Sequence, residues 1–232
     1  DEVTVVRRKY ALVPVRSQIC APDIISGKKI NYIRLTTFNQ LSGSKVREAI
    51  MNGLKDESNA VVLDLRSNSG GLFPGALDIA KQFMSKGQIV LIADSEGVRD
   101  VFEADGTAIA PDVALTVLVD KGTASASEVL AGALRDNKRA TILGDTETFG
   151  KGLIQTVVPL ADGSAVSITV ARYQTPSGAD INKVGINPDG KVPTVMSAES
   201  ESEKTSKPLP SEPGAFCAAL AADETVGGKL FT

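Results

Sequence analysis

The chain has 232 residues, of which 42% are hydrophobic and 23% charged, and its formal net charge is −3. This composition is typical of a folded globular protein, and the negative net charge gives no support to a nucleic-acid-binding function. The sequence contains no histidine, which excludes a Ser-His-Asp or Cys-His catalytic site and any histidine-ligated metal site within this chain. A catalytic nucleophile in this sequence therefore needs another base.

Short strands and one helix are predicted in the first third of the chain. β-Branched residues predict strands over residues 3–6, 10–15 and 30–35. Apolar residues at helical spacing predict a helix from about residue 44 to 54, capped by Ser42 or Ser44. The run NAVVLDL at 59–65 is apolar almost throughout, which is typical of a strand buried on both faces of a parallel sheet.

Helices and strands continue to alternate after that run. Helices are predicted over about 74–84, where a proline occupies the first turn, and 125–137. Further strands are predicted over 88–93, 113–119 and 140–144, with another strand and a turn between the first two, and a hairpin at 153–160 and 164–173. This order predicts an α/β domain in which helices pack on a layered sheet.

The C-terminal part of the sequence differs in composition. Residues 197–215 contain Leu209 as their one large apolar residue, which predicts a flexible linker. The tail, residues 216–232, is apolar enough to dock on the core. No apolar run approaches the ~18–20 residues of a membrane helix, so we expect no integral membrane segment. The strand-like start, without Met or a signal segment, indicates a piece excised from a longer precursor.

Ser125 is a candidate nucleophile. It follows a buried strand in the segment KGTASASE (121–128) and opens a helix. The small residues around it let a substrate backbone come close, and the unpaired N–H groups of a helix N-terminus stabilise an oxyanion. The competing interpretation is an ordinary serine helix cap, because serine is among the preferred N-cap residues.

Lys151 is the candidate base. It has a glycine on each side in TFGKG (148–152), which indicates that its backbone approaches another backbone closely. A lysine acts as a base only when neutral, so its surroundings must disfavour the charged form. Apolar neighbours are expected to provide this burial: Phe149, Leu153 and Ile154. Gln155 is expected on the same face of the following strand.

A third motif, DLRSNSGG (64–71), ends a buried strand in two glycines. Backbone N–H groups at such a turn form an anion-binding nest. The alternative interpretation is a strand-to-helix turn, which requires glycine in any case.

Together, the three motifs resemble those of the carboxyl-terminal processing (tail-specific) serine peptidases, which carry them in the same order. Further stretches, among them GLFPGALDIAKQF and INKVGINPD, resemble the chloroplast members that process the photosystem II D1 protein. The resemblance covers about residues 3–190. It implies a layered crotonase/Clp-like peptidase core over residues 9–196, with a mixed β-sheet, packed helices and a β-hairpin.

The resemblance also implies a role for each site residue. Ser125 is the nucleophile and Lys151 its base, while the backbone N–H groups of Gly71 and Ala126 form the oxyanion hole. Gln155 orients the lysine or the substrate. Weaker candidates are Ser127, Glu128 and Asp136. No metal or other cofactor is implied, and GDTETFGK (144–151) lacks the glycine spacing and the Ser/Thr of a nucleotide-binding P-loop.

The expected partner is a protein with an exposed C-terminal tail, and the resemblance implies the D1 precursor in the chloroplast thylakoid lumen. A bacterial-type periplasmic protease with another substrate is the alternative. Members of the family carry a PDZ domain that captures this tail, and here only its last strand fits, within residues 1–8. A non-catalytic scaffold that uses the same core to bind a ligand or peptide also remains open.

Cys20 and Cys217 are the two cysteines of the sequence. Two cysteines so far apart cannot form a four-cysteine metal site or a CxxC redox pair. Either they form one disulfide that ties the tail to the core, as an oxidising compartment permits, or they are two buried free thiols.

Overall fold

The computed structural model describes residues 12–20, 29–196 and 206–231. Its larger sheet has the strand order β1-β2-β3-β6-β7. β1 pairs antiparallel with β2, and the remaining neighbours pair in parallel, so the predicted mixed α/β sheet is confirmed. Its strands are β1 (Val15–Cys20), β2 (Ile30–Leu35), β3 (Ala60–Asp64), β6 (Ala114–Leu118) and β7 (Thr141–Leu143).

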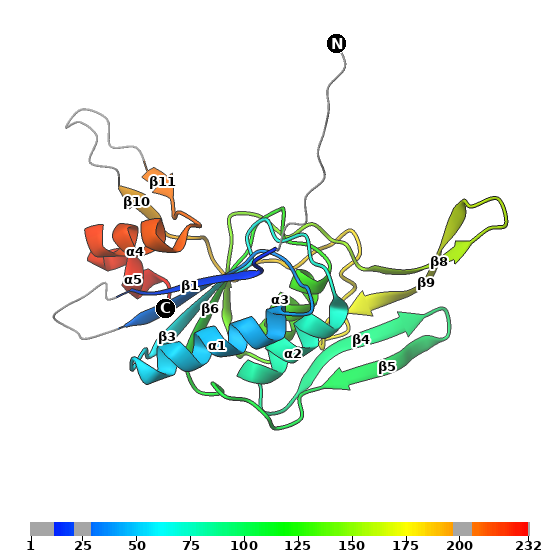
Figure 1. Ribbon diagram of the computed structural model, residues 1–232, viewed down its shortest axis with the longest axis horizontal. Helices are drawn as coiled ribbons and strands as arrows, with labels where there is room; N and C mark the ends of the chain where they lie inside the picture. The colour runs from blue at the N-terminus through cyan, green and yellow to red at the C-terminus, as the bar shows by residue number, and fades with distance from the viewer. Residues whose placement is uncertain (1–11, 21–28, 197–205, 232) are drawn as a thin grey trace, which may run out of the picture.

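Helices cover both faces of this sheet (Figure 1). β3 shows why, because all five of its residues are buried. Val61 and Leu63 face a core shared with three helices, whereas Val62 faces residues 206–231, the C-terminal segment. The predicted burial of this run on two faces is therefore confirmed. The first group of helices is α1 (Ser42–Lys55), α2 (Phe73–Phe83) and α3 (Ala126–Asp136), and the C-terminal helices are α4 (Pro213–Ala222) and α5 (Glu224–Lys229).

A second, antiparallel sheet has the order β5-β4-β9-β8. β9 pairs with β4 only over Arg172–Gln174, so most of the predicted β8–β9 hairpin projects from the body (Figure 1). Both faces of the projecting part are exposed to solvent. The strands are β4 (Gln88–Asp94), β5 (Gly97–Glu103), β8 (Leu153–Pro159) and β9 (Ala165–Gln174).

The N-terminal part of the fold differs from the prediction. The strand expected over 10–15 instead runs from Val15 to Cys20, directly after Pro14, which has no N–H to donate to a ladder. Its partner decides the register, because Val15 pairs with Leu35 and Cys20 with Ile30. The strand expected over 3–6 and the PDZ strand expected within 1–8 lie outside the described residues.

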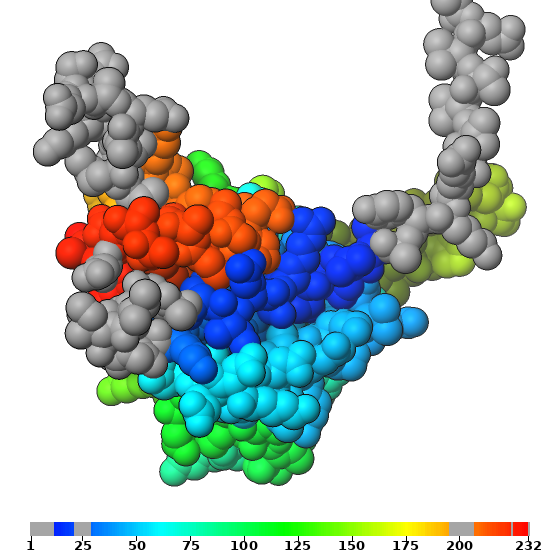
Figure 2. All heavy atoms as spheres, turned by 60° about the vertical axis from the view of Figure 1, so that its left-hand side comes forward, coloured from blue at the N-terminus to red at the C-terminus, as the bar shows by residue number. Residues whose placement is uncertain are grey.

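The C-terminal segment packs on the face of the sheet opposite α1–α3. Within the segment expected to be a linker, 197–215, Ser206–Pro208 forms β11, which pairs with β10 (Thr194–Met196), and α4 begins at Pro213. Buried apolar side chains attach the two helices to the sheet: Phe216, Leu220, Val226 and Leu230. Figure 2 shows α4 and α5, in orange and red, beside the blue surface of β1.

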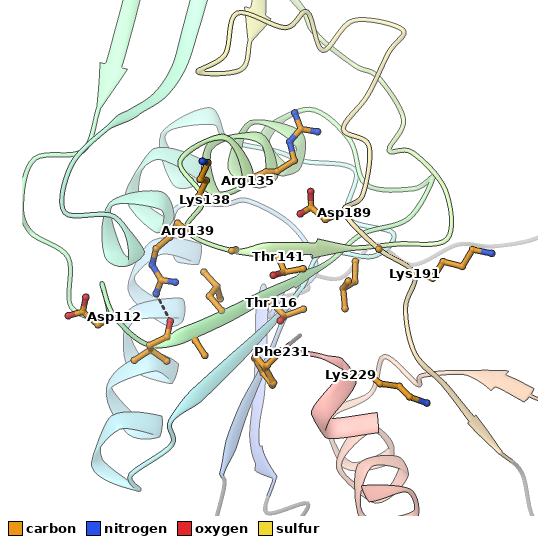
Figure 3. Close-up of a pocket in the computed structure, with 16 residues that line it drawn as sticks. Asp112, Thr116, Arg135, Lys138, Arg139, Thr141, Asp189, Lys191, Lys229 and Phe231 are labelled. Carbon is orange, nitrogen blue, oxygen red and sulfur yellow. Dashed lines mark hydrogen bonds between the residues drawn. The ribbon is translucent and has the colours of Figure 1, made fainter. Parts of the chain in front are cut away.

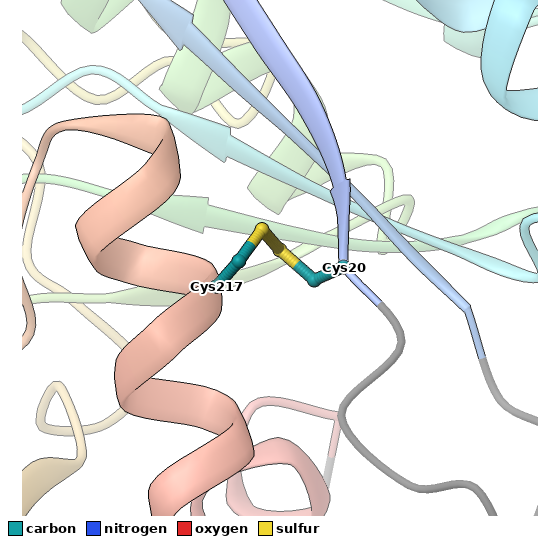
Figure 4. Close-up of a disulfide and its surroundings, with 2 residues drawn as sticks. All are labelled: Cys20 and Cys217. Carbon is teal, nitrogen blue, oxygen red and sulfur yellow. A yellow bond between two sulfur atoms is a disulfide. The ribbon is translucent and has the colours of Figure 1, made fainter.

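A disulfide joins this segment to the sheet. Cys20 at the end of β1 is linked to Cys217 on α4, and their Cα atoms lie 5.0 Å apart (Figure 4). Of the two arrangements left open by the sequence, the structure therefore has the disulfide. Among the described helices, none is long and apolar enough to cross a membrane.

Candidate active site

Ser125 occupies the N-cap position of α3 with an unusual backbone conformation. Its φ is +58° and its ψ is −119°, whereas an N-cap residue ordinarily has β-region angles. A non-glycine residue with such angles costs about 1–3 kcal/mol and persists only where its surroundings enforce it. Strain of this kind is common at active sites, and here it occurs at a residue that also forms a capping box with Glu128.

The loop that follows β3 lies against Ser125. The Asn68 carbonyl accepts hydrogen bonds from the Ala124 N–H (3.0 Å) and from the buried Ser127 hydroxyl (2.9 Å). A Cβ atom added to Gly70 would lie 2.9 Å from the Ser125 Cβ. The DLRSNSGG and SASE motifs are therefore in contact, and the Ser127 hydroxyl links them by a hydrogen bond.

Two backbone N–H groups belong to residues next to this contact: Ala126 follows Ser125, and Gly71 follows Gly70, which lies against Ser125. Gly71 has φ +139°, and a Cβ there would lie 2.1 Å from the Phe38 carbonyl oxygen, so only glycine fits. Phe38 fixes this turn, since its N–H donates to the Gly70 carbonyl and its own carbonyl accepts from Leu72. Within the described part of the chain, neither the Gly71 N–H nor the Ala126 N–H donates to a protein acceptor. Both are thus available to an oxyanion.

Glu128 connects Ser125 to the lysine turn, which is the TFGKG segment at 148–152. Its fully buried carboxylate accepts the Ser125 N–H and the Lys151 N–H on the same oxygen, Oε2, each at 2.8 Å. The other oxygen, Oε1, accepts the Thr148 hydroxyl and the Gly150 N–H, each at 2.6 Å. The backbone nitrogens of Ser125 and Lys151 therefore lie within twice 2.8 Å of each other.

The glycines beside Lys151 meet another backbone segment, as predicted. A Cβ on Gly152 would lie 2.4 Å from the Asn182 backbone nitrogen, and one on Gly150 would lie 3.0 Å from the Lys183 backbone. The Lys183 N–H donates to the Gly150 carbonyl at 2.8 Å. The 182–183 segment therefore supports the lysine turn from behind.

Replacing Gly152 with alanine is expected to destabilise the fold by about 1–3 kcal/mol, because the added methyl group overlaps a backbone that cannot rotate away. Urea unfolding measures this change. Gly228→Ala is the matched control, since a Cβ there meets nothing within 4 Å. Equal midpoints for the two variants would contradict the close approach.

The expected apolar burial of the Lys151 side chain is absent from the described structure. Lys151 is exposed, and its neighbours Phe149 and Leu153 are 63% and 37% exposed. The reason is the projection of the β8–β9 hairpin, which no described element covers. Gln155 is exposed as well, and its side-chain amide donates to the Thr169 hydroxyl across the hairpin (3.2 Å).

Asp136 lies at the other end of α3, about 16 Å from Ser125 at 1.5 Å per residue. It accepts hydrogen bonds from Arg135 and from the Ser177 N–H. Burial disfavours its charged form, but hydrogen bonds from Thr175 and Ser177 outweigh burial and lower the pKa of Asp136. This weaker candidate therefore has a structural role.

The sequence interpretation missed a buried cluster around Asp64 in the DLR motif. The Asp64 carboxylate accepts the Tyr32 hydroxyl at 2.6 Å and the Arg34 guanidinium at 2.7 Å, and it also pairs with Arg66. Burial and the neighbouring carboxylate raise the pKa of Tyr32 above its ordinary value. A charged pair two residues apart at the end of a buried strand was the available signal, because buried charges require partners.

A cavity of about 820 Å³ lies away from these residues (Figure 3). It is lined by the first residues of β6 and β7 and by the last turn of α3, whereas Ser125 and the Gly71 loop follow the carboxyl ends of β6 and β3. Figure 3 shows Lys191 and Lys229 pointing away from its centre. This cavity is therefore not the site built around Ser125. The described residues contain no group of three or more acidic or cysteine side chains placed to hold a metal ion.

Comparison with known proteins identifies the family. Residues 29–192 match the family model of Peptidase family S41. The chain belongs to peptidase family S41. Within this family it is 50% identical over 221 residues to carboxyl-terminal-processing peptidase 2, chloroplastic, of Arabidopsis thaliana. It is 47% identical over 203 residues to the C-terminal processing peptidase, chloroplastic, of Tetradesmus obliquus.

The same architecture is found in a solved structure. The photosystem II D1 C-terminal processing protease matches with a TM-score of 0.82 and 43% identity, over 97% of this chain and 56% of that one. The two sequence matches cover 94% and 84% of this chain but 40% and 44% of the relatives. The chain thus spans about half the length of the S41 proteins that it matches.

Proposed function

We propose that this chain is the catalytic core of a serine endopeptidase that removes C-terminal extensions from proteins, using a Ser125–Lys151 dyad. The observation that carries the proposal is the shared Glu128 oxygen, which fixes the backbones of Ser125 and Lys151 beside two available N–H donors. The names of the S41 relatives support the reaction class.

The geometry suggests how each group acts. The Ser125 Oγ attacks the peptide carbonyl carbon while the neutral Lys151 amine takes its proton. The N–H groups of Gly71 and Ala126 stabilise the resulting oxyanion. The Lys151 ammonium then protonates the leaving amine, which leaves an acyl-enzyme on Ser125. Water attacks this ester, Lys151 again accepts and returns a proton, and the product with a new C-terminal carboxylate is released.

Substrate binding is expected to complete the environment of Lys151. The exposed side chains of Phe149 and Leu153 lie next to it in the chain, and a bound polypeptide would cover them and exclude water. Burial disfavours the ammonium form and so favours the neutral base. Gln155 is proposed to contact substrate or lysine in this covered state.

The substrate and location follow the relatives. We propose the precursor of the photosystem II D1 protein as substrate and the chloroplast thylakoid lumen as location. The names of the chloroplastic relatives and of the solved D1 protease support this proposal. We propose that a PDZ domain selects the substrate tail.

Cleavage of a peptide that carries the C-terminal extension of the D1 precursor tests this function, with the products identified by mass spectrometry. A fluorophosphonate probe is expected to label Ser125. Cleavage of unrelated C-terminal tails at equal rates would favour the periplasmic-type alternative. A folded protein that neither cleaves any tail nor reacts with the probe would favour the non-catalytic scaffold.

The pH dependence gives an independent check. The amine must lose its proton before it can act as a base, so kcat/KM is expected to rise with pH from neutral into the alkaline range. The rate is measured on the same peptide in buffers of constant ionic strength. A profile that is flat between about pH 5 and 9 would exclude an amine base.

A further inference from the structure

The C-terminal segment contacts Arg66, the first residue of the loop that leads to Gly71. The Arg66 guanidinium donates to the carbonyls of Leu209 (2.6 Å) and Pro210 (3.0 Å). The Tyr32 hydroxyl oxygen, whose proton is donated to Asp64, lies 2.9 Å from the Ser211 carbonyl oxygen. Arg66 also pairs with Asp64 and begins the loop that continues to Gly71. The Arg66 side chain therefore contacts the C-terminal segment, and Arg66 is also the first residue of the loop beside Ser125.

The helices that follow are short, and buried apolar side chains of α4, of α5 and of the residue after it hold them on the sheet. Phe216 and Leu220 are the buried apolar residues of the ten-residue α4, and Phe216 stacks on Tyr32 at 4.0 Å between ring centroids. The ion pair of Arg16 with Glu212 is exposed to solvent, so it contributes little. Helices of this length are not stable on their own in water.

The disulfide is the covalent link that holds α4 against β1. Cys217 is partly exposed, whereas Cys20 is 2% exposed, so Cys217 is the more accessible of the two cysteines to an attacking thiolate. The link joins residues 197 positions apart, and the conformational entropy released on opening a loop increases with its length. Opening it therefore leaves α4 and α5 held by their non-covalent contacts alone.

We propose that the Cys20–Cys217 disulfide is a redox modification site at which a dithiol reductant lowers peptidase activity by releasing α4 and the 209–211 segment from Tyr32 and Arg66. The effect on activity rests on the proposed function. Arg66 acts here as a positioning residue for the Ser67–Gly71 loop.

The chemistry is a two-electron thiol–disulfide exchange. A thiolate of the reductant attacks the Cys217 Sγ, and the Cys20 thiolate leaves and takes up a proton. The second thiol of the reductant, as its thiolate, then attacks the mixed disulfide and releases the Cys217 thiolate, which is protonated in turn. The cysteine disulfide becomes two thiols, and the dithiol becomes a disulfide.

The test treats the full chain with dithiothreitol and counts its free thiols. It then measures kcat on the peptide substrate and amide hydrogen exchange at 66–71 and 209–222, before and after reoxidation. We expect kcat to fall reversibly by about five-fold or more, the lower end of usual coupling between two sites. Exchange is expected to accelerate in both segments.

The double variant Cys20→Ser/Cys217→Ser is the matched control. It should have the activity of the reduced protein and should not respond to dithiothreitol. A reduced protein, verified by thiol count, with unchanged kcat and exchange would overturn the proposal. If the oxidised protein is itself inactive, the proposed function fails. Amide hydrogen exchange then tests the redox proposal alone, and unchanged protection of residues 66–71 after reduction would overturn the link between the disulfide and this loop.

Discussion

Replacing Ser125 with alanine is expected to lower kcat by about 10⁴-fold or more, because the nucleophile is removed while the fold remains. The rate is measured on the tail peptide, and circular dichroism verifies the fold. Ser125→Gly should be equally inactive yet more stable than Ser125→Ala by about 1 kcal/mol, since glycine tolerates the φ of +58° at this position. Equal stabilities would mean that the backbone at residue 125 relaxes.

Lys151 provides the matching test of the base. Lys151→Ala should be as inactive as Ser125→Ala, and the double variant should lose little more, because the two residues act in one step. Lys151→Arg should also be inactive, since a guanidinium keeps its proton in a protein. Near-normal turnover by Lys151→Arg would exclude the Ser-Lys assignment.

Glu128→Gln is expected to lower kcat by about 100-fold or more and stability by about 2–4 kcal/mol. The carboxylate accepts four hydrogen bonds, from Ser125, Lys151, Thr148 and Gly150. A glutamine amide replaces one acceptor oxygen with a donor, which leaves buried donors unpaired and separates the nucleophile from the lysine turn. Steady-state kinetics and urea unfolding measure the two effects.

Glu147→Gln is the control for Glu128, because Glu147 is an exposed glutamate in the loop that Glu128 contacts, and its replacement removes the same charge. It should leave both kcat and stability near their original values. Thr148→Val, which removes one of the four donors, should be intermediate in both. A Glu128→Gln enzyme that loses stability but keeps kcat would show that Glu128 has a structural role only.

Local sequence patterns were sufficient to predict much of the fold of this protein. The apolar run at 59–65 predicted a strand buried on both faces, and the glycines beside Lys151 predicted a close backbone approach; the structure has both. Glu128 lies three residues after Ser125, which is the spacing of a capping box. This spacing is explained equally well by a helix start and by a role of Glu128 in the site. Only the fold places Thr148, Gly150 and Lys151 around its carboxylate.

The sequence by itself determined the α/β class, the three motifs and the absence of a histidine base, because these depend on periodicity and residue type. The tertiary structure alone decided what depends on contacts between distant segments. These are the start of β1 at Val15, the attachment of residues 209–210 to Arg66, and the exposure of Lys151. Residue type does not specify burial, since burial depends on which other elements pack against a side chain, and no described element covers the lysine turn.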